Sequence, residues 1–147
     1  MATSEIDSLR NRAKAMNTWY ASCPGTLPSA TLVFIETGNC SYSGNTTLNS
    51  AADPGMLVIY NGTLSFGGTT NFYGLIYAPN AGNLTGNVVT LGGNAQVVGA
   101  IVVDGLGGIS AGSSKLNLLY DANVFNLVTT TTTINVIANS WRELNGH

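Results

Sequence analysis

The chain has 147 residues, only 8% of them charged, and a formal net charge of −2 at pH 7. Its five basic residues are scattered, so there is no broad basic face, which excludes nucleic-acid binding of the usual electrostatic kind. No apolar run reaches the roughly 18 residues of a transmembrane helix, so we expect membrane attachment only through an additional N-terminal segment.

The first predicted element is an amphipathic helix from Ser4 to about Tyr20. Its apolar residues are three and four positions apart and would share one face: Ile6, Leu9, Ala13, Met16 and Tyr20. The helix either covers the apolar end of the fold that follows or is the last part of a longer, membrane-anchoring helix. The two interpretations are compatible, and both stay open.

The two cysteines follow this helix. Neither Cys23 nor Cys40 lies in a CxxC or Cys/His metal spacing. In an oxidising compartment they would form one disulfide, which closes a loop of about 17 residues and stabilises the fold by roughly 3 kcal/mol. Two free thiols in a cytosolic protein are the alternative. The polar, turn-rich surroundings of both residues favour the disulfide.

One pattern of apolar strand, glycine-anchored turn and second short strand occurs four times between Thr31 and Asp121. The copies are Val33–Asn49, Leu57–Gly74, Leu75–Gly99 and Ala100–Asp121. The glycines that precede the second strands lie 24, 25 and 19 residues apart: Gly44, Gly68, Gly93 and Gly112. Hairpin turns recur at roughly 8–12 residues, so this longer period indicates one coil of a solenoid.

Apolar residues alternate along the second short strands and predict one inward face: Tyr42, Leu64, Phe66, Val89, Leu91, Ile109 and Ala111. We therefore predict a mainly β fold, a short β-solenoid (β-helix) of about four coils over residues 21–128. The helix at 4–20 precedes it, and a Thr-rich extended segment at 129–147 follows. An antiparallel β-sandwich is the alternative, but the repeats share residue types as well as hydrophobicity.

The side chains indicate no catalysis. The single histidine, His147, is the last residue, and no metal or cofactor motif occurs. Glu36 and Asp104 are the only plausible carboxylate pair. They align with Tyr60 and Ala78, which places them three coil steps of roughly 4.8 Å apart, or about 14 Å. That distance is too long for paired-carboxylate chemistry, so we predict solvated turn residues and a protein that is not an enzyme.

Two stretches carry a family resemblance. The run Phe72–Asn80, then Val89–Val102 and the closing Ser140–Glu143, resembles the C-terminal domain of bacterial PilX-type pilus-assembly proteins. This resemblance covers roughly residues 55–120 and the final tetrapeptide. It implies a β-solenoid displayed outside the membrane by a pilin-like helix, with other pilin-like subunits as partners and no catalytic residues. The coils are also similar, more loosely, to those of bactofilins, cytosolic solenoids that polymerise end to end.

We therefore expect a non-enzymatic, extracellular or cell-surface structural or adhesive component of a type IV pilus-like or related secretion system. It would act through its solenoid surface and assemble through the N-terminal helix. A self-assembling cytoplasmic solenoid is the alternative. A carbohydrate-binding solenoid is a third possibility, and it requires four tyrosines to line one groove: Tyr42, Tyr60, Tyr73 and Tyr77.

Overall fold

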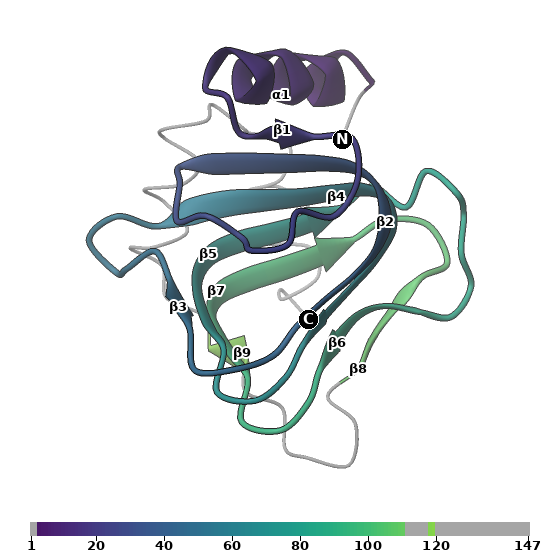
Figure 1. Cartoon of the computed structure of the whole chain (residues 1–147). Coiled ribbons are helices and arrows are strands. Elements are labelled where there is room, and N and C mark those ends of the chain that lie inside the picture. Colours follow the sequence, from purple (N-terminus) through teal and green to yellow (C-terminus); the bar gives the residue numbers. More distant parts are fainter. Residues whose placement is uncertain (1–2, 111–117, 120–147) are drawn as a thin grey trace.

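A computed structural model of the chain describes residues 3–110 and 118–119. It contains one helix, α1 (Thr3–Ala15), and parallel strands that belong to a single sheet. The strands are β1 (Trp19–Tyr20), β2 (Leu32–Tyr42), β3 (Thr47–Leu48), β4 (Gly55–Phe66), β5 (Asn71–Ala78), β6 (Asn87–Leu91), β7 (Gln96–Val103), β8 (Gly108–Ser110) and β9 (Leu118–Leu119). The sheet winds around a common interior, so the predicted β-solenoid with an N-terminal helix is confirmed (Figure 1).

The solenoid has three sides. Side A comprises β1, the first halves of β2 and β4, and the second halves of β5 and β7. Side B comprises the second halves of β2 and β4, followed by β6 and β8. Side C comprises β3, the first halves of β5 and β7, and β9. Long strands therefore bend at the corners and contribute to two sides.

The strand register fixes the number of turns. On side A, Leu32 pairs with Met56, Met56 with Leu75, and Leu75 with Ala100. Three turns of the chain separate the first of these four residues from the last. The described part of the solenoid therefore has about three turns rather than the four coils that we predicted. The steps are uneven because the loops at 49–54 and 79–86 lengthen the chain at different corners.

The interior core is formed by alternate residues of all three sides. Four of the predicted inward residues are buried in it: Leu64, Phe66, Val89 and Leu91. Tyr42 is only partly buried. Ile109 pairs in register with the buried Val89, as an inward residue should, but it is 40% exposed at the last described level of side B. Ala111 lies outside the described residues. Burial of alternate side chains is what a strand period of two requires.

Glycines stack at the corner between sides B and C. Gly44, Gly68 and Gly93 occupy equivalent places in successive turns, as their spacing predicted, and all three have positive φ angles. A Cβ on Gly68 would lie 2.6 Å from the backbone nitrogen of Gly44. Successive turns can therefore stack here only because the side chain is absent. Gly112 lies outside the described residues.

The helix packs on the outside of side A. Ile6, Leu9 and Ala13 are buried, as predicted, and they join the outward side chains of the side A strands, such as Leu32 and Phe34. Figure 1 shows α1 beside the sheet, next to β1. The helix does not cover the open end of the first coil, which differs from our expectation. It also ends at Ala15, because Asn17 has a φ of 62° and the chain then continues into β1 with Tyr20.

The end of the first coil is covered instead by residues 21–31, which we call the plug. Leu27, at its centre, is 6% exposed and packs into the interior core together with Cys23 and Ala30. The plug has no regular secondary structure, which agrees with the helix-breaking sequence Cys23-Pro24-Gly25 and with Pro28. The predicted Thr-rich segment at 129–147 lies outside the described residues.

Candidate functional site

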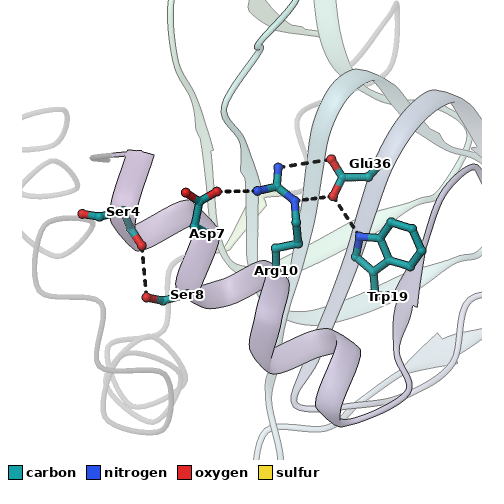
Figure 2. A network of polar contacts seen from close by, with 6 residues as sticks. All are labelled: Ser4, Asp7, Ser8, Arg10, Trp19 and Glu36. Carbon is teal, nitrogen blue, oxygen red and sulfur yellow. Dashed lines mark hydrogen bonds and ion pairs between the residues drawn. The ribbon is translucent and has the colours of Figure 1, made fainter.

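The joint between α1 and the solenoid is the main polar network of the described residues. Arg10, on α1, donates from Nε to Glu36 Oε2 at 2.5 Å and from Nη2 to Glu36 Oε1 at 3.1 Å. Its Nη1 donates to Asp7 Oδ1 at 2.5 Å. The indole of Trp19 donates to Glu36 Oε2 at 2.8 Å. Figure 2 shows these groups converging from the helix, β1 and β2.

Aromatic rings complete the joint. The guanidinium carbon of Arg10 lies 5.0 Å from the ring centroid of Phe34 and 4.8 Å from that of Tyr60. These two rings stack on successive turns, with centroids 6.2 Å apart. Lys14 lies 4.8 Å from the ring of Trp19. A cation placed over an aromatic ring is attracted to it. The rings of the solenoid therefore attract the cations of α1, in addition to the attraction by the carboxylate of Glu36.

The charges of the joint stabilise one another. Burial would raise the pKa of Glu36, but the hydrogen bonds from Arg10 and Trp19 outweigh it and hold that pKa below its ordinary value. The hydrogen bond to Glu36 raises the pKa of Arg10. Both groups are therefore ionised at neutral pH. A carboxylate with this set of donors is a structural anchor and a poor proton donor.

The structure separates Glu36 from the other carboxylate that we considered. Tyr77 donates a hydrogen bond to Asp104 Oδ2 on the last described level of side A. Burial is the largest cause that raises the pKa of Tyr77, and the hydrogen bond to Asp104 raises it further. The register places Pro79, not Ala78, next to the position of Asp104, because Ala78 pairs with Val103. Neither carboxylate is the solvated turn residue that we predicted, since Glu36 is ion-paired and Asp104 is hydrogen-bonded.

The predicted disulfide is present between Cys23 and Cys40, with Cα atoms 5.5 Å apart. The alternative of two free thiols is therefore wrong. Cys40 is buried on β2, with an exposure of 2%, and Cys23 belongs to the plug. The disulfide thus joins the plug to the first turn.

The four tyrosines do not line one groove. Tyr42 ends β2 and donates to the carbonyl of Pro24 at 2.7 Å. Tyr60 stacks in the joint, and Tyr77 is buried on the outside of side A. Tyr73 lies on β5, paired with Val98 of β7 on side C. The condition that we set for a carbohydrate-binding groove is therefore not met.

A shallow hollow of about 280 Å³ lies between the plug and the first turn. Its lining is uncharged: Gly25, Thr26, Leu27, Ser41, Tyr42, Ser43, Thr46, Leu48 and Thr70. No ionisable carboxylate, amine or imidazole is available there for acid–base chemistry. Among residues 3–110 and 118–119, no group of three or more His, Cys, Asp or Glu side chains could hold a metal ion.

The outer surface of side B carries a column of hydroxyl groups. Ser41, Ser65, Thr90 and Ser110 pair in register through four levels. Beside this column, the Thr63 hydroxyl donates to Asn39 Oδ1 of the preceding turn at 3.1 Å. Our sequence analysis missed both this column and the α1 joint. The 24-residue offset between Asn39 and Thr63 could have revealed the first, but no spacing rule links Arg10 to Glu36.

Comparison with protein families gives one match. A family model described as "Domain of unknown function (DUF7305)" matches residues 28–127. This range includes every strand from β2 to β9 and excludes α1, β1 and Cys23. No curated protein and no solved structure matches the chain significantly. In the part of the chain that the structure describes, no helix is long and apolar enough to span a membrane.

Proposed function

The chain belongs to the family described as "Domain of unknown function (DUF7305)", and we propose that it is a non-enzymatic structural or adhesive component of an extracytoplasmic assembly. The assembly is a type IV pilus-like or related secretion system. In this role the solenoid is a rigid surface module, and α1 connects it to neighbouring pilin-like subunits.

The joint between α1 and the solenoid carries this proposal. A bidentate ion pair, a third hydrogen bond from Trp19 and a buried apolar stripe fix one face of α1 to side A. Bidentate Arg–carboxylate pairs set geometry as well as energy. A helix fixed in this way moves with the solenoid as one body, so it can present the solenoid in a defined orientation within an assembly.

The opposite face of α1 remains available for subunit contacts. Its exposed residues include Asn11 and Arg12. They offer a hydrogen-bonding amide and a positive charge for pairing with neighbouring helices. The resemblance to PilX-type pilus-assembly proteins agrees with this arrangement, because there too a helix is expected to carry the solenoid.

The Cys23–Cys40 disulfide supports placement outside the cytosol. Disulfides persist in oxidising compartments and are rare in reducing ones. The described carboxylates of the solenoid at Glu36 and Asp104 already have structural partners, and this supports a non-enzymatic role. The proposal therefore rests on the rigid attachment of α1 to the solenoid and on the disulfide, and it requires no chemical reaction.

The test uses the full-length gene in its own host, with an epitope inserted in the exposed loop at 81–86. We expect the epitope on intact cells and in sheared surface filaments, with Cys23 and Cys40 oxidised. Leu9→Asp, which disrupts the joint, should abolish incorporation, whereas Ala52→Asp, which adds the same charge at an exposed position away from α1, should retain it. A cytosolic protein with reduced cysteines, absent from the filament fraction, would contradict the proposal. Filaments formed by the purified protein alone would support the cytoplasmic alternative.

A further inference from the structure

We propose that the plug conceals a self-association surface, the free edge of β2 at the first turn, and that the Cys23–Cys40 disulfide keeps this surface closed. The occupant of the uncovered edge is a second copy of this chain. This inference goes beyond the proposed function, because it concerns the end of the solenoid and does not involve α1.

The edge of β2 is incompletely paired. β1 pairs with β2 only at Phe34 and Ile35. From Thr37 to Tyr42, β2 pairs only with β4 among the described residues. The carbonyl of Tyr42 accepts from Gly67 on the following turn. Because backbone groups alternate in direction along a strand, those of Asn39 and Ser41 point to the opposite edge.

These outward backbone groups have no partner among the described residues. No hydrogen bond links the N–H or C=O of Asn39 or Ser41 to the plug. A strand edge with free donors and acceptors is a ready template for another strand. The plug lies against this part of β2, since Cys23 is bonded to Cys40 and the Pro24 carbonyl accepts from Tyr42, but it does not satisfy the hydrogen bonds of the edge.

The plug is held at few points. Three hydrogen bonds hold it: from Tyr42 to the Pro24 carbonyl, from Asn49 N to Ser29 Oγ at 3.0 Å, and from Met56 N to the Thr31 carbonyl at 2.8 Å. Leu27 is buried, and two further plug residues, Cys23 and Ala30, pack against the interior core. The hollow of about 280 Å³ lies under residues 25–27, so packing there is incomplete. Apart from the main chain at its two ends, the disulfide is the one covalent link between plug and solenoid in the described chain. When the disulfide is lost, residues 21–31 are held over the edge by these noncovalent contacts alone.

A second copy fits the uncovered edge. No charged side chain occurs from Thr37 to Tyr42 or in β3, so two copies do not repel each other there. A twofold axis would place two β2 edges antiparallel, which allows regular hydrogen bonding and buries the apolar ends of both interiors. Such an isologous contact uses the same surface on both copies. It therefore closes at a dimer and does not propagate into a filament.

Opening requires reduction of the disulfide. A dithiol attacks through its thiolate, breaks the Sγ–Sγ bond and is itself oxidised to a cyclic disulfide. Two electrons and two protons pass to Cys23 and Cys40, which become thiols. Cys23 is the accessible sulfur, because Cys40 is only 2% exposed.

The experiment measures molar mass by light scattering over a hundredfold range of protein concentration. The samples are the oxidised chain, the chain in a dithiol reductant, and Cys23→Ser/Cys40→Ser. We expect a monomer when oxidised and a twofold higher mass in the other two samples. Hydrogen exchange should become faster at residues 21–31 and slower at 37–42. A monomer in all three samples, despite fast exchange at 21–31, would overturn the proposal.

Two further variants keep the proposal falsifiable. Ser41→Pro, added to the cysteine-free chain, blocks the outward N–H without touching the pairing with β4, and it should restore the monomer. A dimer that persists would exclude this edge as the interface. If the Cys23→Ser/Cys40→Ser chain does not fold by circular dichroism, Cys23→Ala/Cys40→Ala replaces it, because alanine leaves no unpaired hydroxyl at the buried position 40, and it should also give a dimer. A folded Cys23→Ala/Cys40→Ala chain that stays monomeric despite fast exchange at 21–31, or a polymer in any sample, would contradict the isologous edge pairing.

Discussion

Gly62 stacks so closely on Gly38 of the preceding turn that a Cβ on Gly62 would lie 1.9 Å from the Gly38 carbonyl oxygen. Gly62 also has a φ of 148°, a conformation that L side chains rarely adopt. Both residues lie between side A and side B, where the chain bends. Close stacking of successive turns at this corner therefore requires glycine.

We predict that Gly62→Ala destabilises the protein by about 3 kcal/mol, because the new Cβ forces two turns apart and strains the backbone. Urea unfolding followed by circular dichroism measures the change. Gly86→Ala is the matched control, since a Cβ there meets nothing within 4 Å, and its effect should stay within about 0.5 kcal/mol. Equal stabilities of the two variants would show that the corner tolerates a side chain.

The ion pair between Arg10 and Glu36 predicts that the stability of the protein depends on pH in the acid range. Hydrogen bonds from Arg10 and Trp19 lower the pKa of Glu36, so its stabilising effect is fully present above the unfolded value of about 4.3. The effect is lost as pH falls through the lower folded pKa. Glu36→Gln should therefore lower the free energy of unfolding by about 1–2 kcal/mol at pH 7. The difference in this free energy between the variant and the wild type should become smaller below about pH 4.

Urea unfolding at several pH values tests this expectation, with Asp53→Asn as the control for an exposed carboxylate. The control should differ little from the wild type at pH 7. A gap between Glu36→Gln and the wild type that does not change with pH would mean that the charge of Glu36 does not stabilise the joint.

A substitution on the buried face of α1 should release the helix and spare the solenoid. Leu9→Asp places a charge in the outer cluster with Phe34, and an unpaired buried charge is strongly unfavourable. We expect backbone amides of residues 7–15 to lose protection from hydrogen exchange, while those at 56–59 keep theirs. Asn11→Asp on the exposed face should leave both regions protected. Loss of protection in both regions would indicate that the solenoid cannot fold without α1.

The aromatic stack inside the solenoid predicts a large cavity effect. The Phe66 ring lies 6.4 Å from that of Tyr42 and 6.2 Å from that of Phe72, and Phe66 is fully buried. Phe66→Ala should cost about 3–5 kcal/mol. Leu106→Ala removes an apolar side chain that is 69% exposed and should be nearly neutral. Thermal unfolding of both variants tests the difference, and similar melting temperatures would argue against a tightly packed interior.

The sequence alone determined the kind of fold. Gly44, Gly68 and Gly93 recur at the coil period because successive turns touch at that corner, and residues such as Leu64 and Phe66 alternate because a strand turns one face inward. Both are local requirements that repeat in every turn, so a single chain displays them as a pattern. The pairing of Cys23 with Cys40 was also predictable, since only two cysteines exist.

Only the tertiary structure decided how the ends and the helix are used. The position of α1 on side A depends on Arg10 meeting Glu36 across 26 residues, a contact that occurs once and leaves no period to read. The plug covers the first turn because Leu27 fills the interior, and a single leucine among polar residues does not predict this. Repeated contacts are encoded as periodicity, whereas unique long-range contacts become visible only once the turns are stacked.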